Sequence, residues 1–171
     1  MPELLAPTVR LHRPWLEAHR EWGPGLHEDG FGLSASDQVD SPAGFAAWVA
    51  SLPEDRAVYR WLIEDGQVLG GIALRTGPAE YVAWAGHLGF GIRPSARGRG
   101  LASWALRQML PEARRLELPR VLLVCAGENL ASAKTIERAG GVLEEVRQTD
   151  RGPVRRYWIT LEAAAPGPPS S

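Results

Sequence analysis

The stretch GHLGFGIRPSARGRGLA (residues 86–102) decides the fold, because it joins an apolar run to a glycine- and arginine-rich loop and then to a helical pattern. A loop that follows a strand and opens a helix points unpaired backbone N–H groups outward at the positive end of the helix dipole. Gly98 and Gly100 remove side chains that would block an anion, while Arg97 and Arg99 add charged donors. The stretch therefore predicts a site for phosphate groups, and a diphosphate suits it best.

Two common phosphate-binding motifs are excluded. The loop lacks the Gly-Lys-Ser/Thr ending of a P-loop. It also lacks the third glycine of a dinucleotide fingerprint, and Cys125 stands where that motif needs an acidic residue after the next strand. The sequence thus indicates a diphosphate site of another kind.

The rest of the chain predicts an α+β fold dominated by hairpins. Before the loop, the spacing of apolar residues predicts helices at about 13–22 and 41–52, the second with Ser41 as N-cap and Pro42 at its first position. Two β-favouring runs flank Asp65-Gly66 and predict a tight hairpin, and residues 76–86 read as a linker.

After the loop, a helix is expected from Leu101, with Pro111 kinking or restarting it. A buried strand ending at Cys125 comes next. Asn129 is expected to cap a short helix that Gly140 ends, and two strands flank the turn DRGP (residues 150–153).

Composition favours a single cytoplasmic domain. The 171 residues suit one domain at 1–162 with a disordered tail at 163–171, and the net charge of −1 argues against binding to nucleic acid or an anionic membrane. The first residues lack a signal-peptide pattern, and no run is long enough to span a membrane. The lone Cys125 excludes a disulfide framework, and His12, His19 and His27 form no metal-ligand pattern, so no metal is expected.

Three segments in order resemble the GNAT superfamily of N-acetyltransferases: GHLGFGIRPSARGRGLA, VLLVCAGENLASAKTIERAGG and RRYWITL. The first contains Arg97-x-x-Gly100-x-Ala102, which is similar to the acyl-CoA pyrophosphate loop of that family. More narrowly, the segments resemble a bacterial subgroup of acetyltransferases with GGHIGY-type and RYWI-type motifs. The resemblance covers about residues 61–161 and reaches the first sixty residues only in outline.

The resemblance implies a GNAT fold, with a mostly antiparallel sheet of about six or seven strands, helices on both faces, and a V-shaped gap between strands four and five. It implies acetyl-CoA as co-substrate, with its pantetheine arm along the fourth strand and its pyrophosphate on the loop. The residues that it assigns to cofactor binding are Phe90, Gly91, Ile92, Arg97, Gly98, Arg99, Gly100, Leu101, Ala102, Asn129 and Ser132.

The implied reaction is direct transfer of the acetyl group to a primary amine of a small molecule or peptide in a ternary complex. It needs a base for the amine and a proton donor for the leaving thiolate. His87 is the first candidate for the base; Glu128, Glu64 or a chain of water molecules are alternatives. Ile136 replaces the tyrosine that many family members use as the acid, so Tyr157, Ser132, Asn129 or bulk water must serve.

The sequence leaves the acceptor amine open. Acidic residues of the early helical region favour a cationic amine, although solvated helix faces explain them equally well; they are Glu17, Glu21, Glu28 and Asp29. Trp22 and Trp84 are expected near the acceptor cleft, and the other tryptophans mostly in the core. A CoA-binding module without turnover is the alternative function. The superfamily often forms dimers through late strands, so a homodimer is one option.

Overall fold

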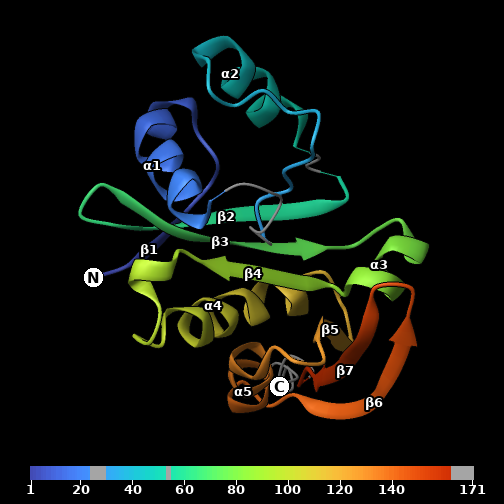
Figure 1. The fold of residues 1–171 in the computed structure, drawn as a ribbon. Helices are drawn as coiled ribbons and strands as arrows, with labels where there is room; N and C mark the ends of the chain where they lie inside the picture. Colours follow the sequence, from blue (N-terminus) through green and yellow to red (C-terminus); the bar gives the residue numbers. More distant parts are fainter. Residues whose placement is uncertain (24–29, 53–54, 163–171) are drawn as a thin grey trace, which may run out of the picture.

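The structure, a computed structural model, describes residues 1–23, 30–52 and 55–162. The tail predicted at 163–171 lies outside the described residues. Within them, seven strands form two sheets, which confirms the expected strand number and the α+β class. Figure 1 shows helices on both sides of the first sheet, as predicted.

The first sheet is antiparallel, in the order β1-β2-β3-β4. Its strands are β1 (Glu3–Leu5), β2 (Ala57–Glu64), β3 (Gln67–Arg75) and β4 (Leu88–Ile92). The predicted hairpin joins β2 to β3, and Asp65 and Gly66 have φ angles of 51° and 75°. Two successive positive φ angles are what a two-residue turn between twisted strands requires.

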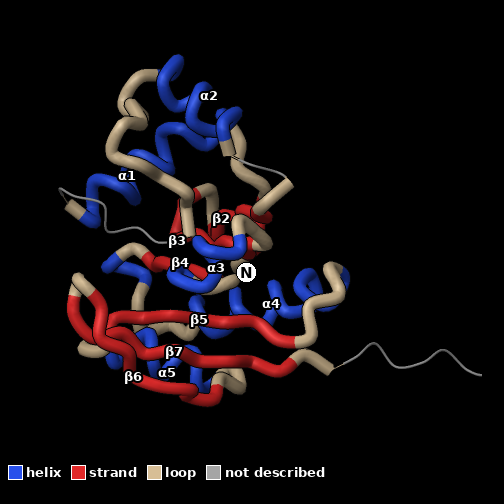
Figure 2. Tube along the Cα trace, turned by 90° about the vertical axis from the view of Figure 1, so that its right-hand side faces the viewer, coloured by secondary structure: helices blue, strands red, loops and turns tan. Residues whose placement is uncertain are grey.

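The second sheet is also antiparallel and has the order β5-β7-β6. Its strands are β5 (Arg120–Ala126), β6 (Val142–Thr149) and β7 (Gly152–Thr160). Figure 2 shows this sheet below the first, with β5 nearest to β4 and β6 at the outer edge.

Four longer helices cover these sheets. Helices α1 (His12–Trp22) and α2 (Pro42–Ser51) lie on one side of the first sheet, and α4 (Leu101–Arg115) and α5 (Leu130–Arg138) on the other (Figure 1). The predicted caps are confirmed: Ser41 Oγ accepts a hydrogen bond from the Gly44 amide, and Asn129 Oδ1 accepts one from the Ser132 amide. Gly140 follows the end of α5 with a φ of 101°. Short 3₁₀ turns lie at Val9–Leu11 and Pro94–Ala96.

The apolar core has two parts. An aromatic cluster between α1, α2 and the first sheet includes Trp15, Trp48 and Trp61, which confirms that these tryptophans are core residues. The larger cluster lies around α4 and extends to α5 and both sheets. Trp104, also predicted to be in the core, is only half-buried against this second cluster.

The structure differs from the sequence analysis at three places. Residues 79–85 form helix α3 (Ala79–Ala85) rather than a linker, because two buried arginines donate to its carbonyl groups: Arg75 to Ala85 and Arg156 to Ala83. Helix α4 continues through Pro111 without restarting. Strand β1 was not predicted; it pairs with Trp61–Ile63 of β2 and has only three residues, too few for a periodic pattern.

Strands β4 and β5 meet only near one end, among the residues described. The His87 amide donates to the Leu122 carbonyl over 2.7 Å, and Gly86 forms a bridge with Leu123. Beyond this point the two strands belong to separate sheets, so the edge of β4 that faces β5 has no strand partner. This is the predicted gap between the fourth and fifth strands.

Candidate active site

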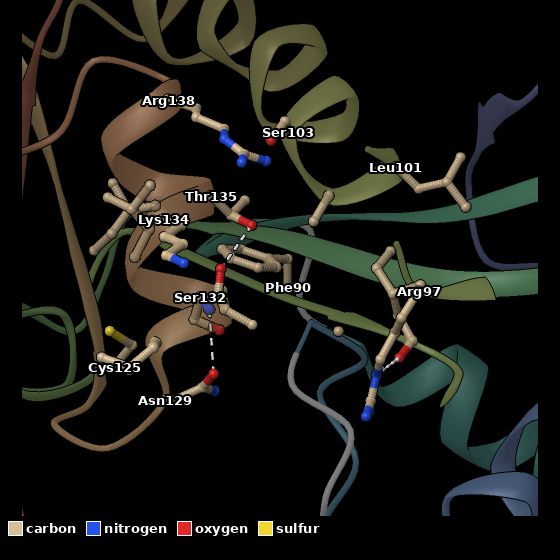
Figure 3. A pocket seen from close by; sticks show the side chains of 18 of the residues that line it. Phe90, Arg97, Leu101, Ser103, Cys125, Asn129, Ser132, Lys134, Thr135 and Arg138 are labelled. Atoms are coloured by element: carbon tan, nitrogen blue, oxygen red, sulfur yellow. Dashed lines mark hydrogen bonds between the residues drawn. The ribbon is translucent and has the colours of Figure 1, made fainter. Parts of the chain in front are cut away.

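A cavity of about 740 Å³ lies in the gap between β4 and β5. Its walls come from these two strands, the glycine-rich loop and the first turn of α4, one face of α5, and the end of α1. The structure brings together in this cavity every predicted cofactor-binding residue except Arg99: Phe90, Gly91, Ile92, Arg97, Gly98, Gly100, Leu101, Ala102, Asn129 and Ser132. Figure 3 shows Phe90, Leu101, Asn129 and Ser132 around it.

The loop before α4 presents backbone to the cavity. Gly98 and Gly100 have φ angles of 79° and 75°, and a Cβ atom at either position would meet no other atom within 4 Å. Gly100 is the N-cap of α4 and supplies no side-chain cap, so the amides of the first turn from Leu101 are left for another acceptor. This arrangement suits an anion with several oxygen atoms.

The two arginines of this loop are held differently. Arg97 Nε donates to the Ile92 carbonyl over 2.9 Å, which fixes its guanidinium beside the end of β4 at the cavity. Arg99 instead donates to Glu64 Oε2 over 2.7 Å, and its side chain does not line the cavity. This hydrogen bond from Arg99 lowers the pKa of Glu64, which therefore stays ionised and paired.

Strand β4 offers a free backbone edge to a ligand. On one side Phe90, Gly91 and Ile92 pair with Ile72, Gly71 and Gly70 of β3. On the other side they line the cavity. An extended polar chain, such as the two amides of pantetheine, can add there in the manner of another strand.

Helix α5 contributes cations that the sequence analysis did not single out. Lys134, Thr135 and Arg138 line the cavity, and Figure 3 shows the Arg138 side chain pointing toward α4, whose Ser103 also lines it. Lys134 and Arg138 are four residues apart on one helix, so they share a face. This i, i+4 pair on the helix after Asn129 was the signal available in the sequence.

The first candidates for the base and the acid, His87 and Tyr157, lie outside the cavity lining, whereas Asn129 and Ser132 line it. Tyr157 is completely buried, and its hydroxyl donates to Glu137 Oε1 over 2.9 Å. Burial, together with this hydrogen bond, raises the pKa of Tyr157. The environment therefore favours a structural tyrosine, and its role as proton donor stays a prediction.

His87 makes two hydrogen bonds to Leu122 of β5. Its amide donates to the Leu122 carbonyl, and its Nδ1 accepts a hydrogen bond from the Leu122 amide over 2.8 Å. The ring is half-buried, and burial lowers the pKa of the imidazole. A neutral ring leaves Nε2 protonated, so Nε2 cannot accept a proton in this state. The role of His87 as base stays a prediction, and its contacts favour holding β4 against β5.

The other predicted side chains are dispersed. Trp22 lines the cavity, and its place beside an acceptor stays a prediction, whereas Trp84 is 56% exposed and contacts Arg151. Glu17 pairs with Arg13 on an exposed helix face, and Glu128 is exposed. Glu28, Asp29 and His27 lie outside the described residues.

Cys125 lines the cavity as a half-buried thiol. Burial raises its pKa, so the thiol stays protonated at neutral pH and is a poor nucleophile. In the parts of the chain that the structure describes, no group of three or more His, Cys, Asp or Glu residues could hold a metal ion, and no helix could span a bilayer.

Comparison with known proteins identifies the fold and the family. A family model described as an acetyltransferase (GNAT) domain matches residues 10–142. The chain belongs to the GNAT acetyltransferase family. The loop and the gap between β4 and β5 are therefore parts of a GNAT fold, and the protein is an acetyltransferase.

Three solved GNAT structures are similar to this chain over nearly their whole length. RimL, a ribosomal L7/L12 alpha-N-protein acetyltransferase in complex with coenzyme A, has 18% identity and a TM-score of 0.70, covering 95% of this chain and 96% of that one. MccE, the microcin C7 self-immunity acetyltransferase in complex with acetyl-CoA and AMP, has 14% identity and a TM-score of 0.72, with 94% and 92% covered. A ribosomal-protein-S5-alanine acetyltransferase from Vibrio fischeri has 14% identity and a TM-score of 0.73, with 96% of each chain covered. No curated protein matches the sequence significantly.

Proposed function

We propose that this GNAT domain transfers the acetyl group of acetyl-CoA directly to a primary amine of a small molecule or a peptide, within a ternary complex. The observation that carries the proposal is the cavity between β4 and β5, which has open loop amides at one end and a free strand edge along its side. Structural neighbours with ribosomal-protein and microcin substrates in their names support an amine acceptor.

In this proposal the loop and the α5 cations bind the phosphates. The amides from Gly98 to Ala102 donate hydrogen bonds to the oxygen atoms of the pyrophosphate, with Arg97 at its side. Lys134 and Arg138 add positive charge where the cavity continues along α5. Charge-assisted hydrogen bonds of this kind are about twice as strong as neutral ones, which favours a ligand with several phosphate oxygens.

The chemical step needs the acetyl carbonyl held in the gap, with the amine on the Trp22 side. Acetyl-CoA supplies an activated thioester, and no covalent enzyme intermediate is needed. The C–N bond forms as the C–S bond breaks, and the proton lost by the amine passes to a chain of water molecules. We assign Ser132 to passing a proton on to the leaving thiolate, with its own hydroxyl reprotonated from that water, because Ser132 lines the cavity and is half-buried, whereas Tyr157 is bonded to Glu137. Asn129 Oδ1 accepts the capping hydrogen bond of α5, and the side-chain N–H groups of Asn129 can then donate to the developing oxyanion.

The alternative is a CoA-binding module without turnover, and Ile136 is the residue that raises it. Ile136 is only 1% exposed and offers no proton donor at the position where many relatives have tyrosine. The two functions differ in one measurable respect, because only an enzyme releases free CoA thiol when an amine is present.

The test is a thiol-release assay with acetyl-CoA and a panel of amines, aminoglycosides, amino acids and peptides whose N-terminal residue is serine or alanine. We expect at least one class to raise thiol release well above the rate without acceptor, with the acetylated amine found by mass spectrometry. Tight acetyl-CoA binding with no release for any class would support the binding module instead. The Ser132→Ala variant should lower kcat with little change in acetyl-CoA affinity.

A further inference from the structure

The carboxylate of Glu21 makes three hydrogen bonds to the segment that leads into the glycine-rich loop. Its Oε2 accepts from Arg93 Nε over 2.9 Å, from the Ser95 amide over 3.1 Å and from Ser95 Oγ over 3.0 Å. The hydrogen bond from Arg93 is the main cause that lowers the pKa of Glu21 to about 2. Glu21 is therefore ionised at any working pH, and its charge is committed to these contacts rather than to an acceptor amine.

Arg93 is itself fixed to the first sheet. Its amide donates to the Leu69 carbonyl over 2.8 Å, and Nη1 donates to the Val68 carbonyl over 3.3 Å. The side chain is 13% exposed. Through Arg93, Glu21 thus joins β3 to the turn that starts the phosphate loop.

Glu21 also lies next to Trp22, the residue that the sequence analysis placed near the acceptor cleft. The next residue, Trp22, lines the cavity and packs edge-on against Phe31, with ring centroids 5.9 Å apart. Two residues after Ser95, Arg97 lines the same cavity from the loop. One carboxylate therefore links the end of α1, where an acceptor is expected, to the loop where the cofactor phosphates are expected.

We infer that Glu21 is a positioning residue, which holds the coenzyme A loop in its binding conformation and ties it to the Trp22 wall. The inference rests on the proposed function of the loop. A loop that is already ordered loses less conformational freedom when the cofactor binds, so its affinity is higher. Glu21 is not itself one of the residues that line the cavity, and in this account it does not contact the substrate.

The direction in which acetyl-CoA affinity changes in one variant separates a positioning role from a simple charge effect. Glu21→Gln removes a negative charge near an anion site, so charge alone would tighten acetyl-CoA binding. If Glu21 positions the loop, the same change weakens binding, because a neutral amide holds Arg93 less well than a carboxylate does. Glu17→Gln is the matched control, because Glu17 lies one turn earlier on α1 and pairs with the exposed Arg13.

The experiment measures acetyl-CoA binding by calorimetry and stopped flow for the wild type, Glu21→Gln, Glu17→Gln and Ser95→Ala. We expect Kd to rise about tenfold in Glu21→Gln, mostly through a slower association rate, and by about twofold to threefold in Ser95→Ala. Glu17→Gln should bind like the wild type. Circular dichroism confirms that each variant is folded at the temperature used.

Unchanged or tighter binding in Glu21→Gln would overturn the inference and leave the proposed function intact. If that variant does not fold, Ser95→Ala decides, and wild-type affinity in it overturns the inference. A wild type that does not bind acetyl-CoA would instead contradict the proposed function.

Discussion

Gly100 shows how one residue determines the chemistry of the loop. Its φ of 75° is a conformation that costs an L side chain about 1–2 kcal/mol, and a side chain there would extend into open space at the mouth of the cavity. The position therefore restricts the residue type twice, through the backbone and through the approach of a ligand.

Replacing Gly100 with valine should raise the Kd for acetyl-CoA by about tenfold or more, because the branched side chain keeps phosphate from the loop amides. Gly152→Val is the matched control, since Gly152 also has a positive φ, of 101°, and open space around it, but is the first residue of β7 and lies outside the cavity lining. Both variants should lose similar stability in urea unfolding. Equal acetyl-CoA affinity for the two variants by calorimetry would contradict the loop assignment.

His87 makes stability depend on pH. Burial lowers its pKa below the ordinary value near 6.5, so folding favours the neutral ring. The stability from this group is present above about pH 6.5 and is lost as the pH falls towards the folded pKa, because the unfolded chain then binds more protons. Protonation of Nδ1 would also break the bond from the Leu122 amide.

The His87→Asn variant should therefore show a smaller fall in Tm between about pH 7.5 and 5 than the wild type. The Asn oxygen can accept the Leu122 N–H bond without titrating. Thermal unfolding at several pH values measures this, and parallel curves for the two proteins would count against the explanation. Turnover in the same variant tests whether His87 is the base. An unaltered kcat and an unaltered pH profile would exclude that role.

At the scale of elements, the sequence predicted those turns and helix ends that residues close together in the chain determine. The β2–β3 hairpin follows from Asp65-Gly66, and the N-terminus of α5 follows from Asn129, because each signal lies within a few residues of the structure that it forms. Helix α3 was missed, because its carbonyl groups are satisfied partly by Arg156, 73 positions away. No local pattern contains such a contact.

The cap of α5 has a structural and a binding role that two substitutions can separate. Asn129→Ala loses the hydrogen bond from the Ser132 amide, so it should cost about 1 kcal/mol in urea unfolding. Asn129→Asp keeps the cap and suits the helix dipole, so stability should return. Asn129→Asp should nevertheless bind acetyl-CoA more weakly than the wild type, because a carboxylate in the cavity repels an anionic ligand. Wild-type affinity in Asn129→Asp by calorimetry would place the cofactor away from this helix end.

At the scale of the whole molecule, the site exists because two sheets separate. The bond between His87 and β5 closes one end of the gap, and α4 and α5 provide the walls of the cavity beyond it. The sequence predicted the gap through resemblance to the family, and all of the cofactor-binding residues that it assigned except Arg99 line the cavity there. It did not predict that Arg99 would pair with Glu64, 35 positions away, or that Tyr157 would be buried against Glu137, because both outcomes depend on how distant elements pack.

The measurement that tests the central claim most directly is a titration of the ¹⁵N-labelled protein with coenzyme A, followed by amide chemical shifts. We predict that the largest shifts fall on the amides from Gly98 to Ser103, followed by those of Phe90 to Ile92 along β4. The amides of β1 and α2, which are outside the cavity lining, should scarcely move. Saturable shifts centred away from the loop, with Gly98 and Gly100 unchanged, would contradict the assignment.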